Sequence, residues 1–350
     1  MLLSPSLAPS RFQFRAELEK LLETFLEERA REHSEIDPRL ALATEELAAL
    51  VLGGGKRLRP WFVDWGHRAA GGVPDLRLAH AAAAVEMVHT FALVQDDIID
   101  RSGLRRGRAA VHLALAADAG DHYGLSAALL VSDLAFIWAD VLLLESGYAG
   151  AELEAAFRVF NTLRVEVTIG QFQDLALGAF GSFDADLALE VNQRKTAGYT
   201  VLRPLELGMA LAGAQEQLLE DAAAYAQPAG VAFQIRDDLL GAFGDSRVTG
   251  KPDGDDLASA KPTWLLASGL AIDGSAGREL RRLVELPNRG EAEVGKMRDA
   301  LVAGGAVAEA ERLIERLRGR ALRAVRRMAI ASSHRSELEA MTARLVDRAS

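Results

Sequence analysis

Residues 91–100, FALVQDDIID, and residues 231–241, VAFQIRDDLLG, are helix-forming stretches that each carry a pair of aspartates. Apolar residues precede and follow both pairs, Asp96-Asp97 and Asp237-Asp238, as is typical of a helix that borders buried surface. A charge in such a position is costly without a partner. Both stretches therefore predict helices whose carboxylates hold a ligand, rather than a solvated acidic face.

The paired aspartates have the donor chemistry of a magnesium site. Ionised Asp offers only acceptor oxygens, which suit hard divalent ions, and substrate phosphates can complete the coordination. On a helix, Asp96 and Asp100 lie on one face because they are four residues apart, whereas Asp97 is offset around the axis. Of the residues nearby in the sequence, only Arg101 is expected to neutralise them. We expect the two acidic stretches to form two halves of one metal cradle.

The sequence around these stretches predicts an all-α fold. No proline occurs between Pro74 and Pro204, and this interval is rich in Ala, Leu and Glu, so several uninterrupted helices can form. Helical spacing of apolar residues also occurs near the start of the chain, at Phe14, Leu18, Leu21 and Phe25. We expect one domain over residues 1–350, in which residues 1–45 form a helical extension.

Composition limits the class of protein. The 350 residues are 49% hydrophobic, which is enough for a substantial core without disulfides. There is no cysteine, so thiolate metal sites and cysteine nucleophiles are excluded. The net charge of -10 argues against a nucleic-acid partner.

No part of the sequence predicts export or a membrane span. Residues 1–9 lack a basic segment followed by an apolar core, so we find no secretory signal and expect a cytoplasmic protein. The most apolar stretch, residues 78–94, is interrupted by His80, Glu86 and His89. It is too polar to be a convincing transmembrane helix.

Two basic segments predict the other side of a site. Residues 53–60, GGGKRLRP, place three glycines beside three cations, so the backbone can approach an anion that the side chains neutralise. Residues 105–108, RRGR, begin five residues past Asp100. We expect a metal-bound diphosphate site flanked by a direct cation-diphosphate site.

A long loop, residues 244–262, follows the second acidic stretch and is expected to be a closing flap.

Six motifs in this order resemble the trans-isoprenyl diphosphate synthases: GGGKRLRP, DDIID followed by RRG, GQFQD, KT, FQIRDD and GKPDGDDLASAK. Each is weak alone, but six in order over roughly residues 50–265 are specific. The resemblance implies an all-α, barrel-like bundle, a homodimer, with the two acidic motifs facing each other across a deep central cavity. It also implies a Mg²⁺-dependent prenyltransferase that condenses isopentenyl diphosphate with C5, C10 or C15 allylic diphosphates into a linear all-trans product.

The resemblance also assigns roles to residues at matching positions. The diphosphate of isopentenyl diphosphate is assigned to Gly55, Lys56, Arg59, His89 and Arg106. The allylic diphosphate is assigned to Arg105, Lys195, Thr196, Gln234 and Lys251, with Lys261 closing over it and Gln171 as a further substrate-binding residue. The expected ligands of three Mg²⁺ ions are Asp96, Asp100 and Asp237, supported by Asp97, Asp174 and Asp238. The expected catalytic residues are Asp96, Asp97, Asp100, Arg105, Lys195, Thr196, Gln234, Asp237 and Lys251.

Phe91 and Ala92 lie five and four residues before Asp96, where the family's cavity floor lies. A bulky ring there stops a growing chain by steric exclusion. Because DDIID has no insertion, the pattern resembles that of C20 producers, and we expect geranylgeranyl diphosphate, with C15 and C25 as close competitors. Simple core packing of Phe91 is equally compatible with the sequence.

Three positions depart from the family pattern: Gly241 stands where many members have the last Asp of the second motif, Ser132 precedes Asp133 where glycine is common, and Ala260 precedes Lys261. Water bound to magnesium can fill the place of the missing acid, so we expect activity.

Two other functions stay open. One is a class I terpene cyclase, although its second metal motif is absent, and the other is a non-catalytic subunit of a heteromeric prenyl synthase, although such subunits usually lose the acidic motifs.

Overall fold

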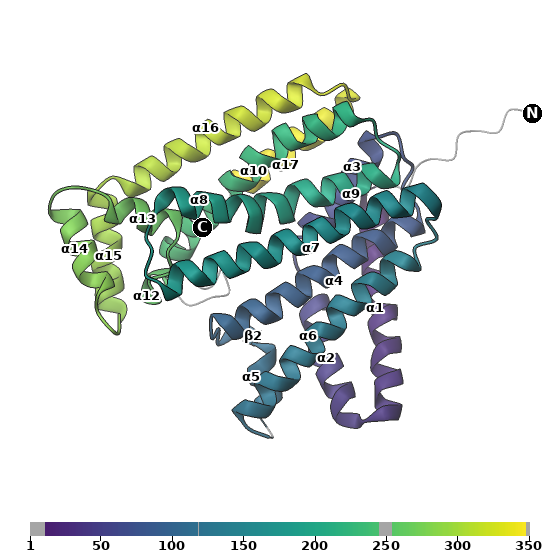
Figure 1. Ribbon diagram of the computed structural model, residues 1–350, viewed down its shortest axis with the longest axis horizontal. Coiled ribbons are helices and arrows are strands. Elements are labelled where there is room, and N and C mark those ends of the chain that lie inside the picture. The colour runs from purple at the N-terminus through teal and green to yellow at the C-terminus, as the bar shows by residue number, and fades with distance from the viewer. Residues whose placement is uncertain (1–10, 118, 245–253, 348–350) are drawn as a thin grey trace, which may run out of the picture. The chain divides into compact units, whose positions relative to one another are not determined.

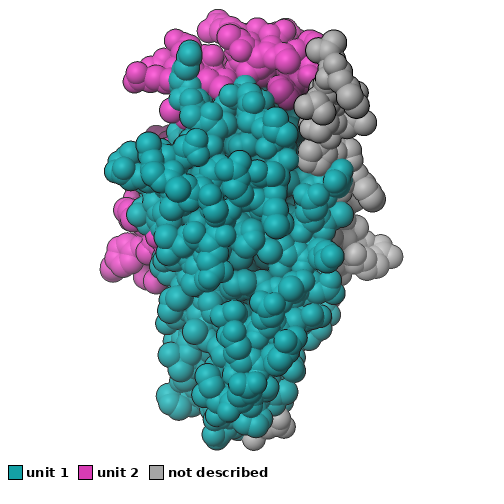
Figure 2. Space-filling model, turned by 90° about the vertical axis from the view of Figure 1, so that its right-hand side faces the viewer, with its two compact units in different colours: residues 1–162, 204–215 teal, residues 163–203, 216–350 magenta. Residues whose placement is uncertain are grey.

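The computed structural model describes residues 11–117, 119–244 and 254–347, which are helical almost throughout (Figure 1). This confirms the expected all-α class. The chain divides into two compact units, coloured separately in Figure 2. Unit 1 holds residues 1–162 and 204–215, and unit 2 holds residues 163–203 and 216–350. The single domain over residues 1–350 and its central cavity stay predictions.

Unit 1 contains the first acidic stretch and both basic segments. Its elements are α1 (Arg11–Ile36), α2 (Pro38–Leu52), α3 (Leu58–Ala69), α4 (Leu76–Ile99), β1 (Leu104–Arg105), β2 (Arg108–Ala109), α5 (Val111–Ala116), α6 (Asp121–Leu144), the first part of α7 (Gly150–Ala179) and nearly all of α9 (Arg203–Leu211). The fold of this unit therefore positions the first half of the candidate site.

Helix α4 is the central helix of unit 1 and packs against α1, α2, α3, α5 and α6. The Asp75 carboxylate caps its start by accepting a hydrogen bond from the Leu78 backbone N at 3.2 Å. Residues 81–84 are four buried alanines, whose small side chains allow neighbouring helices to approach closely. The acidic stretch at the end of α4 is thereby fixed to a packed core.

By length and composition, α4 and α6 could each cross a membrane. Helix α6 is the more apolar of the two, so the expectation that residues 78–94 are the most apolar stretch is wrong. In α4, 67% of the apolar window is buried in the protein, as is typical of a core helix. Composition alone therefore did not exclude a span at residues 78–94, and the expected absence of one stays a prediction.

The predicted N-terminal helix exists as α1, with a buried stripe that differs from the expected one by a single position. Leu22 is fully buried, whereas Leu21 is only half-buried. The rest of the stripe is Phe14, Leu18, Phe25 and Leu26. Helix α2 begins after the Asp37 cap, with Pro38 in its first turn, and continues past residue 45 to Leu52. The expected boundary of the extension thus falls inside a helix.

Helices α3 and α9 approach each other through two glycines. A Cβ on Gly208 would lie 2.0 Å from the carbonyl oxygen of Val63, and a Cβ on Gly66 would lie 2.3 Å from that of Leu205. Neither distance is possible for a real side chain, so this contact requires glycine on both helices.

Unit 2 contains the second acidic stretch and the polar residues between the two stretches. Its elements are the rest of α7, α8 (Ala185–Asn192), the π-helix η1 (Gln193–Leu202), α10 (Glu216–Phe243), α12 (Asp255–Ala258), α13 (Trp264–Leu270), α14 (Ser275–Val284), α15 (Glu291–Ala303), α16 (Ala306–Arg327) and α17 (Ser332–Val346). Helix α10 is its central helix and packs against η1 and α16.

Arg236 ties α10 to the C-terminal helices of unit 2. Its guanidinium donates to both carboxylate oxygens of Glu311 at 2.7 Å and to the carbonyl oxygen of Val346 at 2.8 Å. This arginine directly precedes the second aspartate pair, so the contacts fix the end of α10 that carries the pair.

Gly208→Ala should lower the free energy of unfolding by about 1–3 kcal/mol, because the added methyl group must push α9 away from α3. Thermal unfolding followed by circular dichroism measures the change. Gly295→Ala in α15 is the matched control, since a Cβ there meets no described atom within 4 Å and should leave stability equal or slightly higher. Equal losses in both variants would contradict the proposed close contact.

Candidate active site

The C-terminal end of α4 carries the first acidic cluster. Asp96 and Asp97 lie in the last turn, and Asp100 caps the helix with its backbone N donating to the Asp96 carbonyl at 2.8 Å. Asp97 is buried, Asp96 half-buried and Asp100 exposed. The last turn of a helix carries a partial negative charge of its own, so carboxylates placed there favour a bound cation.

Arg105 is the protein counter-ion of this cluster. Its Nε lies 2.9 and 3.0 Å from the two carboxylate oxygens of Asp97, its Nη2 also bonds Asp97, and the same Nη2 lies 3.5 Å from Asp96 Oδ2. Arg101, the cation expected from sequence proximity to neutralise the cluster, is exposed and has left-handed backbone at φ 53°. That expectation is wrong because the chain folds back and brings Arg105 to Asp97 instead.

The fold-back is a short hairpin that the sequence analysis did not predict. Strands β1 and β2 pair with Leu104 opposite Ala109 and Arg105 opposite Arg108. The two residues between them, Arg106 and Gly107, both have positive φ, 55° and 75°, which is the geometry of a tight two-residue hairpin. With only two residues in each strand, no alternating pattern exists for sequence analysis to detect.

The same hairpin brings Arg106 to the glycine-rich segment, residues 53–55. Its guanidinium donates to the carbonyl oxygens of Leu50, at 2.7 Å, and of Gly54. A Cβ on Gly55, whose φ is 145°, would lie 3.1 Å from Arg106 Nη2, so glycine lets the guanidinium pack against the backbone. The two basic segments of the sequence therefore meet.

His89 lies among these arginines. Burial, followed by the charges of Arg59, Arg106 and Arg105, holds the pKa of His89 well below its usual range, so the imidazole is neutral at pH 7. A neutral imidazole within a group of arginines suits an anionic ligand, to which it can donate a hydrogen bond. Lys56 is exposed, and Arg59 is half-buried at the start of α3.

In unit 2, a chain of hydrogen bonds links the KT and FQIRDD motifs. The Thr196 hydroxyl donates to Gln234 Oε1 at 2.5 Å, and Gln234 Nε2 donates to Asp238 Oδ1 at 2.9 Å. These two partners fix which way the Gln234 amide points. Gly230 makes the approach possible, because a Cβ there would lie 2.3 Å from the Cα of Ala197.

Lys195 and Thr196 lie on η1, a ten-residue π-helix, where the sequence predicted an ordinary helix. A π-helix carries an extra residue in each turn and occurs frequently at functional sites. Gly170 of α7 gives η1 room, since a Cβ there would lie 2.9 Å from the Cα of Lys195. The segment that carries two expected catalytic residues therefore adopts a helix form that is energetically costly.

Asp174, expected to support the metal, is paired with two expected substrate-binding lysines. Lys195 Nζ lies 2.6 Å and Lys261 Nζ 3.8 Å from Asp174 Oδ2. Gln171 is half-buried three residues earlier on α7, on about the same face. The structure thus brings together four predicted site residues within unit 2, including both described lysines.

Asp238 is a buried acid whose second oxygen has no hydrogen-bond partner among the described residues. Burial raises the pKa of Asp238 to about 7. The hydrogen bond from Gln234 opposes this shift, and the charges of Asp256 and Asp237 add to it. An orphaned carboxylate oxygen beside Asp237 fits a position that a cation occupies when bound.

Asp256 of α12 explains the missing acid at Gly241. A Cβ on residue 241 would lie 2.0 Å from Asp256 Oδ2, so the carboxylate of Asp256 occupies the place that a side chain at 241 would take. In the sequence Asp256 is one residue of the long loop 244–262, and nothing local distinguishes it, because its approach to α10 depends on long-range folding. The one sign of this contact in the sequence was Gly241, which stands where many family members have an acid.

The two halves of the expected cradle belong to different units of the structure. Asp96 and Asp100 belong to unit 1 and Asp237 to unit 2, so their meeting stays a prediction. Across the described ranges, no three Asp, Glu or His side chains gather tightly enough to hold an ion alone. Lys251 lies outside the described residues, together with the rest of residues 245–253 of the expected flap.

A model of the polyprenyl synthetase family matches residues 41–302. The chain belongs to the polyprenyl synthetase family. It is therefore a transferase, a trans-prenyl diphosphate synthase. This finding confirms the resemblance carried by the six motifs and removes the terpene cyclase as the leading alternative.

Relatives of this polyprenyl synthetase differ in the product that they are named for. It is 33% identical over 267 residues to a geranylfarnesyl diphosphate synthase of Aeropyrum pernix, covering 75% of this chain and 80% of the relative. It is 36% identical over 226 residues to a farnesyl diphosphate synthase of Mycobacterium tuberculosis, covering 65% and 60%. The crystal structure of a geranylgeranyl pyrophosphate synthase from Corynebacterium glutamicum, complexed with isoprenyl diphosphate and magnesium, has a TM-score of 0.91 at 34% identity, covering 96% and 99%.

Polyprenyl synthetases are Mg²⁺-dependent, and the donors of this chain fit that ion. The aspartates are oxygen ligands, and those of α4 lie at its C-terminal end, where the backbone itself favours a cation. The orphaned oxygen of Asp238 agrees with this assignment.

Adding an acid at residue 241 should impair this polyprenyl synthetase. Gly241→Asp should lower kcat by about tenfold, because the new side chain displaces the Asp256 carboxylate. The measurement is turnover as a function of Mg²⁺ concentration. Gly241→Ala should also lower kcat, but in an Asp256→Ala background it should cost nothing further, since there is no carboxylate left to displace. A gain of activity from Gly241→Asp would refute the explanation.

Proposed function

We propose that this polyprenyl synthetase makes geranylgeranyl diphosphate, a C20 product, from isopentenyl diphosphate and C5, C10 or C15 allylic diphosphates. It acts in the cytoplasm as a homodimer and holds three Mg²⁺ ions when substrate is bound. Family membership leaves the product length open, because the named relatives include synthases for shorter and longer chains. The product assignment depends on one observation, a pair of aromatic rings near the first acidic cluster.

Phe91 of α4 packs against Phe136 of α6, with ring centroids 4.7 Å apart and planes inclined at 48°. Both rings are half-buried, unlike core rings such as Phe62 and Phe160, which are fully buried. Phe91 lies five residues, less than two helical turns, before Asp96. This favours a blocking floor over simple core packing, since two rings in contact present a wide barrier to a growing prenyl chain.

The two diphosphates bind to different groups. Isopentenyl diphosphate is held by the basic cluster of unit 1, in which Gly55 gives the backbone room for Arg106. The cations of that cluster are Lys56, Arg59 and Arg106, joined by neutral His89. The allylic diphosphate is held by Arg105, Lys195 and Lys261, and by Lys251.

The reaction breaks the allylic carbon-oxygen bond and forms a carbon-carbon bond to the alkene of isopentenyl diphosphate. Magnesium held by Asp96, Asp100 and Asp237 would stabilise the negative charge that develops on the leaving diphosphate. Lysines 195 and 261, close to Asp174, neutralise the same group. Asp97, which also supports the metal ligands, keeps Arg105 oriented through two-point contact.

The cationic allyl group needs oxygen dipoles and exclusion of water. Thr196 and Gln234 supply adjacent oxygens, and the hydrogen bond to Asp238 holds the Gln234 carbonyl in its orientation. The proton lost when the new double bond forms passes to the released diphosphate, so no protein base is required.

Purified protein incubated with Mg²⁺, isopentenyl diphosphate and each allylic diphosphate tests the proposal by mass spectrometry. A linear C20 product is expected, whereas hydrocarbons or no product would overturn it.

Asp96→Ala and Asp237→Ala should each lower kcat by at least about 100-fold, because each removes a ligand for the ion that stabilises the departing charge. Both side chains are only half-buried, so the temperature of thermal unfolding should change little. Asp299→Ala, at an exposed position in α15, is the control and should retain full turnover. Full turnover in either cradle variant would refute the metal assignment.

Phe91→Ala should shift the product beyond C20, because removing the ring opens the floor to further condensation. Product length by mass spectrometry gives the answer, and condensation itself should continue. Phe180→Ala, which removes a ring that is 85% exposed, should leave the length unchanged. If Phe91→Ala still ends at C20, the floor lies elsewhere and the reaction assignment stands.

A further inference from the structure

Arg57 stands between two expected substrate-binding cations but has a different environment. Lys56 is exposed and Arg59 half-buried, whereas the Arg57 side chain is only 3% exposed. Its backbone is left-handed, with φ 47°, a conformation that costs energy for any residue with a Cβ. Neither feature is expected of a residue that binds substrate directly.

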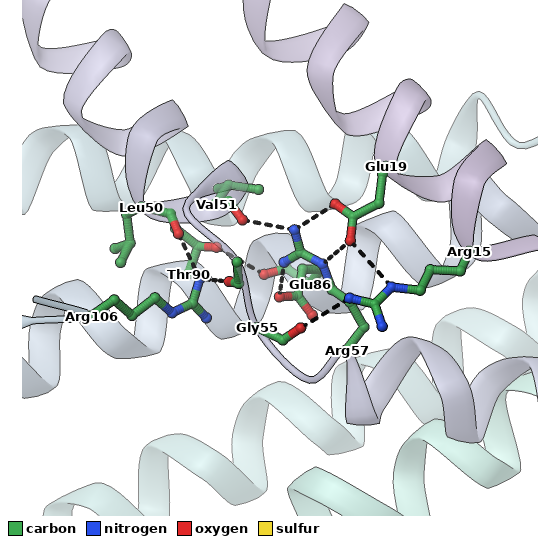
Figure 3. Close-up of polar contacts among 10 residues, drawn as sticks. Arg15, Glu19, Leu50, Val51, Gly55, Arg57, Glu86, Thr90 and Arg106 are labelled. Atoms are coloured by element: carbon green, nitrogen blue, oxygen red, sulfur yellow. Dashed lines mark hydrogen bonds and ion pairs between the residues drawn. The ribbon is translucent and has the colours of Figure 1, made fainter. Parts of the chain in front are cut away.

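The Arg57 guanidinium joins three helices (Figure 3). It donates to both carboxylate oxygens of Glu19 in α1, at 2.9 and 2.8 Å, and to Glu86 in α4 at 2.5 Å. It also donates to the carbonyl oxygen of Val51 near the end of α2, at 2.8 Å. The arginine thus fills its donor positions with protein groups that a lysine could not satisfy together.

These contacts fix the shape of the glycine-rich segment. The segment enters from α2 at Gly53 and leaves at Arg57, so the αL conformation of Arg57 determines the direction in which Lys56 and α3 follow. Glycines 54 and 55 have positive φ and supply no rigidity of their own. The bonds of Arg57 therefore offset both the local strain and the flexibility of the glycines.

Helix α1 makes a second contact with the same segment. Arg15, one turn before Glu19, donates to the carbonyl oxygen of Gly55 at 3.3 Å (Figure 3). Arg106 holds Gly54 from the hairpin. The hydrogen bond from Arg57 also holds the pKa of Glu19 below its usual range. The carboxylate that α1 contributes is therefore ionised at neutral pH.

We propose that Arg57 and Glu19 are positioning residues for the isopentenyl diphosphate subsite, so that α1 is a working part of that subsite. The proposal rests on the proposed function, since it assigns Lys56 and Arg59 to that diphosphate. Glu19 touches no substrate. It holds Arg57, and Arg57 holds the segment that presents Lys56 and Arg59.

Glu19→Gln tests this role without creating a cavity, because the side chain keeps its size and is 36% exposed. It should raise KM for isopentenyl diphosphate by about five- to tenfold, as expected for the loss of one charged hydrogen bond, with KM for the allylic substrate and kcat within about twofold of wild type. Arg57→Lys should show the same selective change. Glu19→Asp, which keeps the charge, should restore part of the affinity.

Glu23→Gln is the matched control, since Glu23 lies one turn further along α1 and is exposed. Titration calorimetry with isopentenyl diphosphate alone gives a readout that needs no turnover. Unchanged affinity in Glu19→Gln, or an equal loss of affinity for both substrates accompanied by a lower Tm, would overturn the proposal. A wild-type protein that binds isopentenyl diphosphate but condenses nothing would refute the proposed function, and the binding comparison would still test Glu19.

Discussion

Negative charge near the C-terminal ends of two helices is the constraint on which this site depends. In α4 the backbone already directs partial negative charge toward the acidic pair, and in α10 burial makes an ionised Asp238 costly without a partner. Arg105 neutralises the buried Asp97, while the second oxygen of Asp238 has no described partner. That oxygen is suited to accept a bound cation as its partner.

Much of the arrangement was predictable because it depends on local pattern. Apolar periodicity identified the helices that carry Asp96 and Asp237, and the glycine-rich segment next to Lys56 indicated an anion site. The errors arise where distant segments decide the outcome. Arg105 replaces Arg101 as counter-ion because of a two-residue hairpin turn, and Asp256 approaches residue 241 only after the chain has returned to α10. The expected apolar stripe of α1 contained Leu21, whereas Leu22 is the buried residue. This error of one position arose because the sequence does not show which helices pack against α1.

Close backbone contact connects packing with chemistry in unit 2. Gly170 and Gly230 let α7 and α10 reach the backbone of η1, and this contact brings the Thr196 hydroxyl to the Gln234 amide. In unit 1 the same role falls to charged side chains. Arg57 fixes the end of the glycine-rich segment to α1 and α4, and Arg106 holds Gly54 from the hairpin. Neither the glycine contacts nor the arginine contacts can be recognised from the motif residues alone, because both depend on which backbone atoms of other segments lie next to these residues.

The π-helix η1 makes the number of residues in this segment as important as their identity. Each residue added to or removed from a helix rotates everything beyond it by roughly 100° relative to what precedes it. A chain one residue shorter between Gln193 and Leu202 could relax to an ordinary α-helix and gain local stability. It would also turn Lys195 and Thr196 out of register with the helices that follow. Evolution can therefore substitute residues in this segment far more freely than it can insert or delete them.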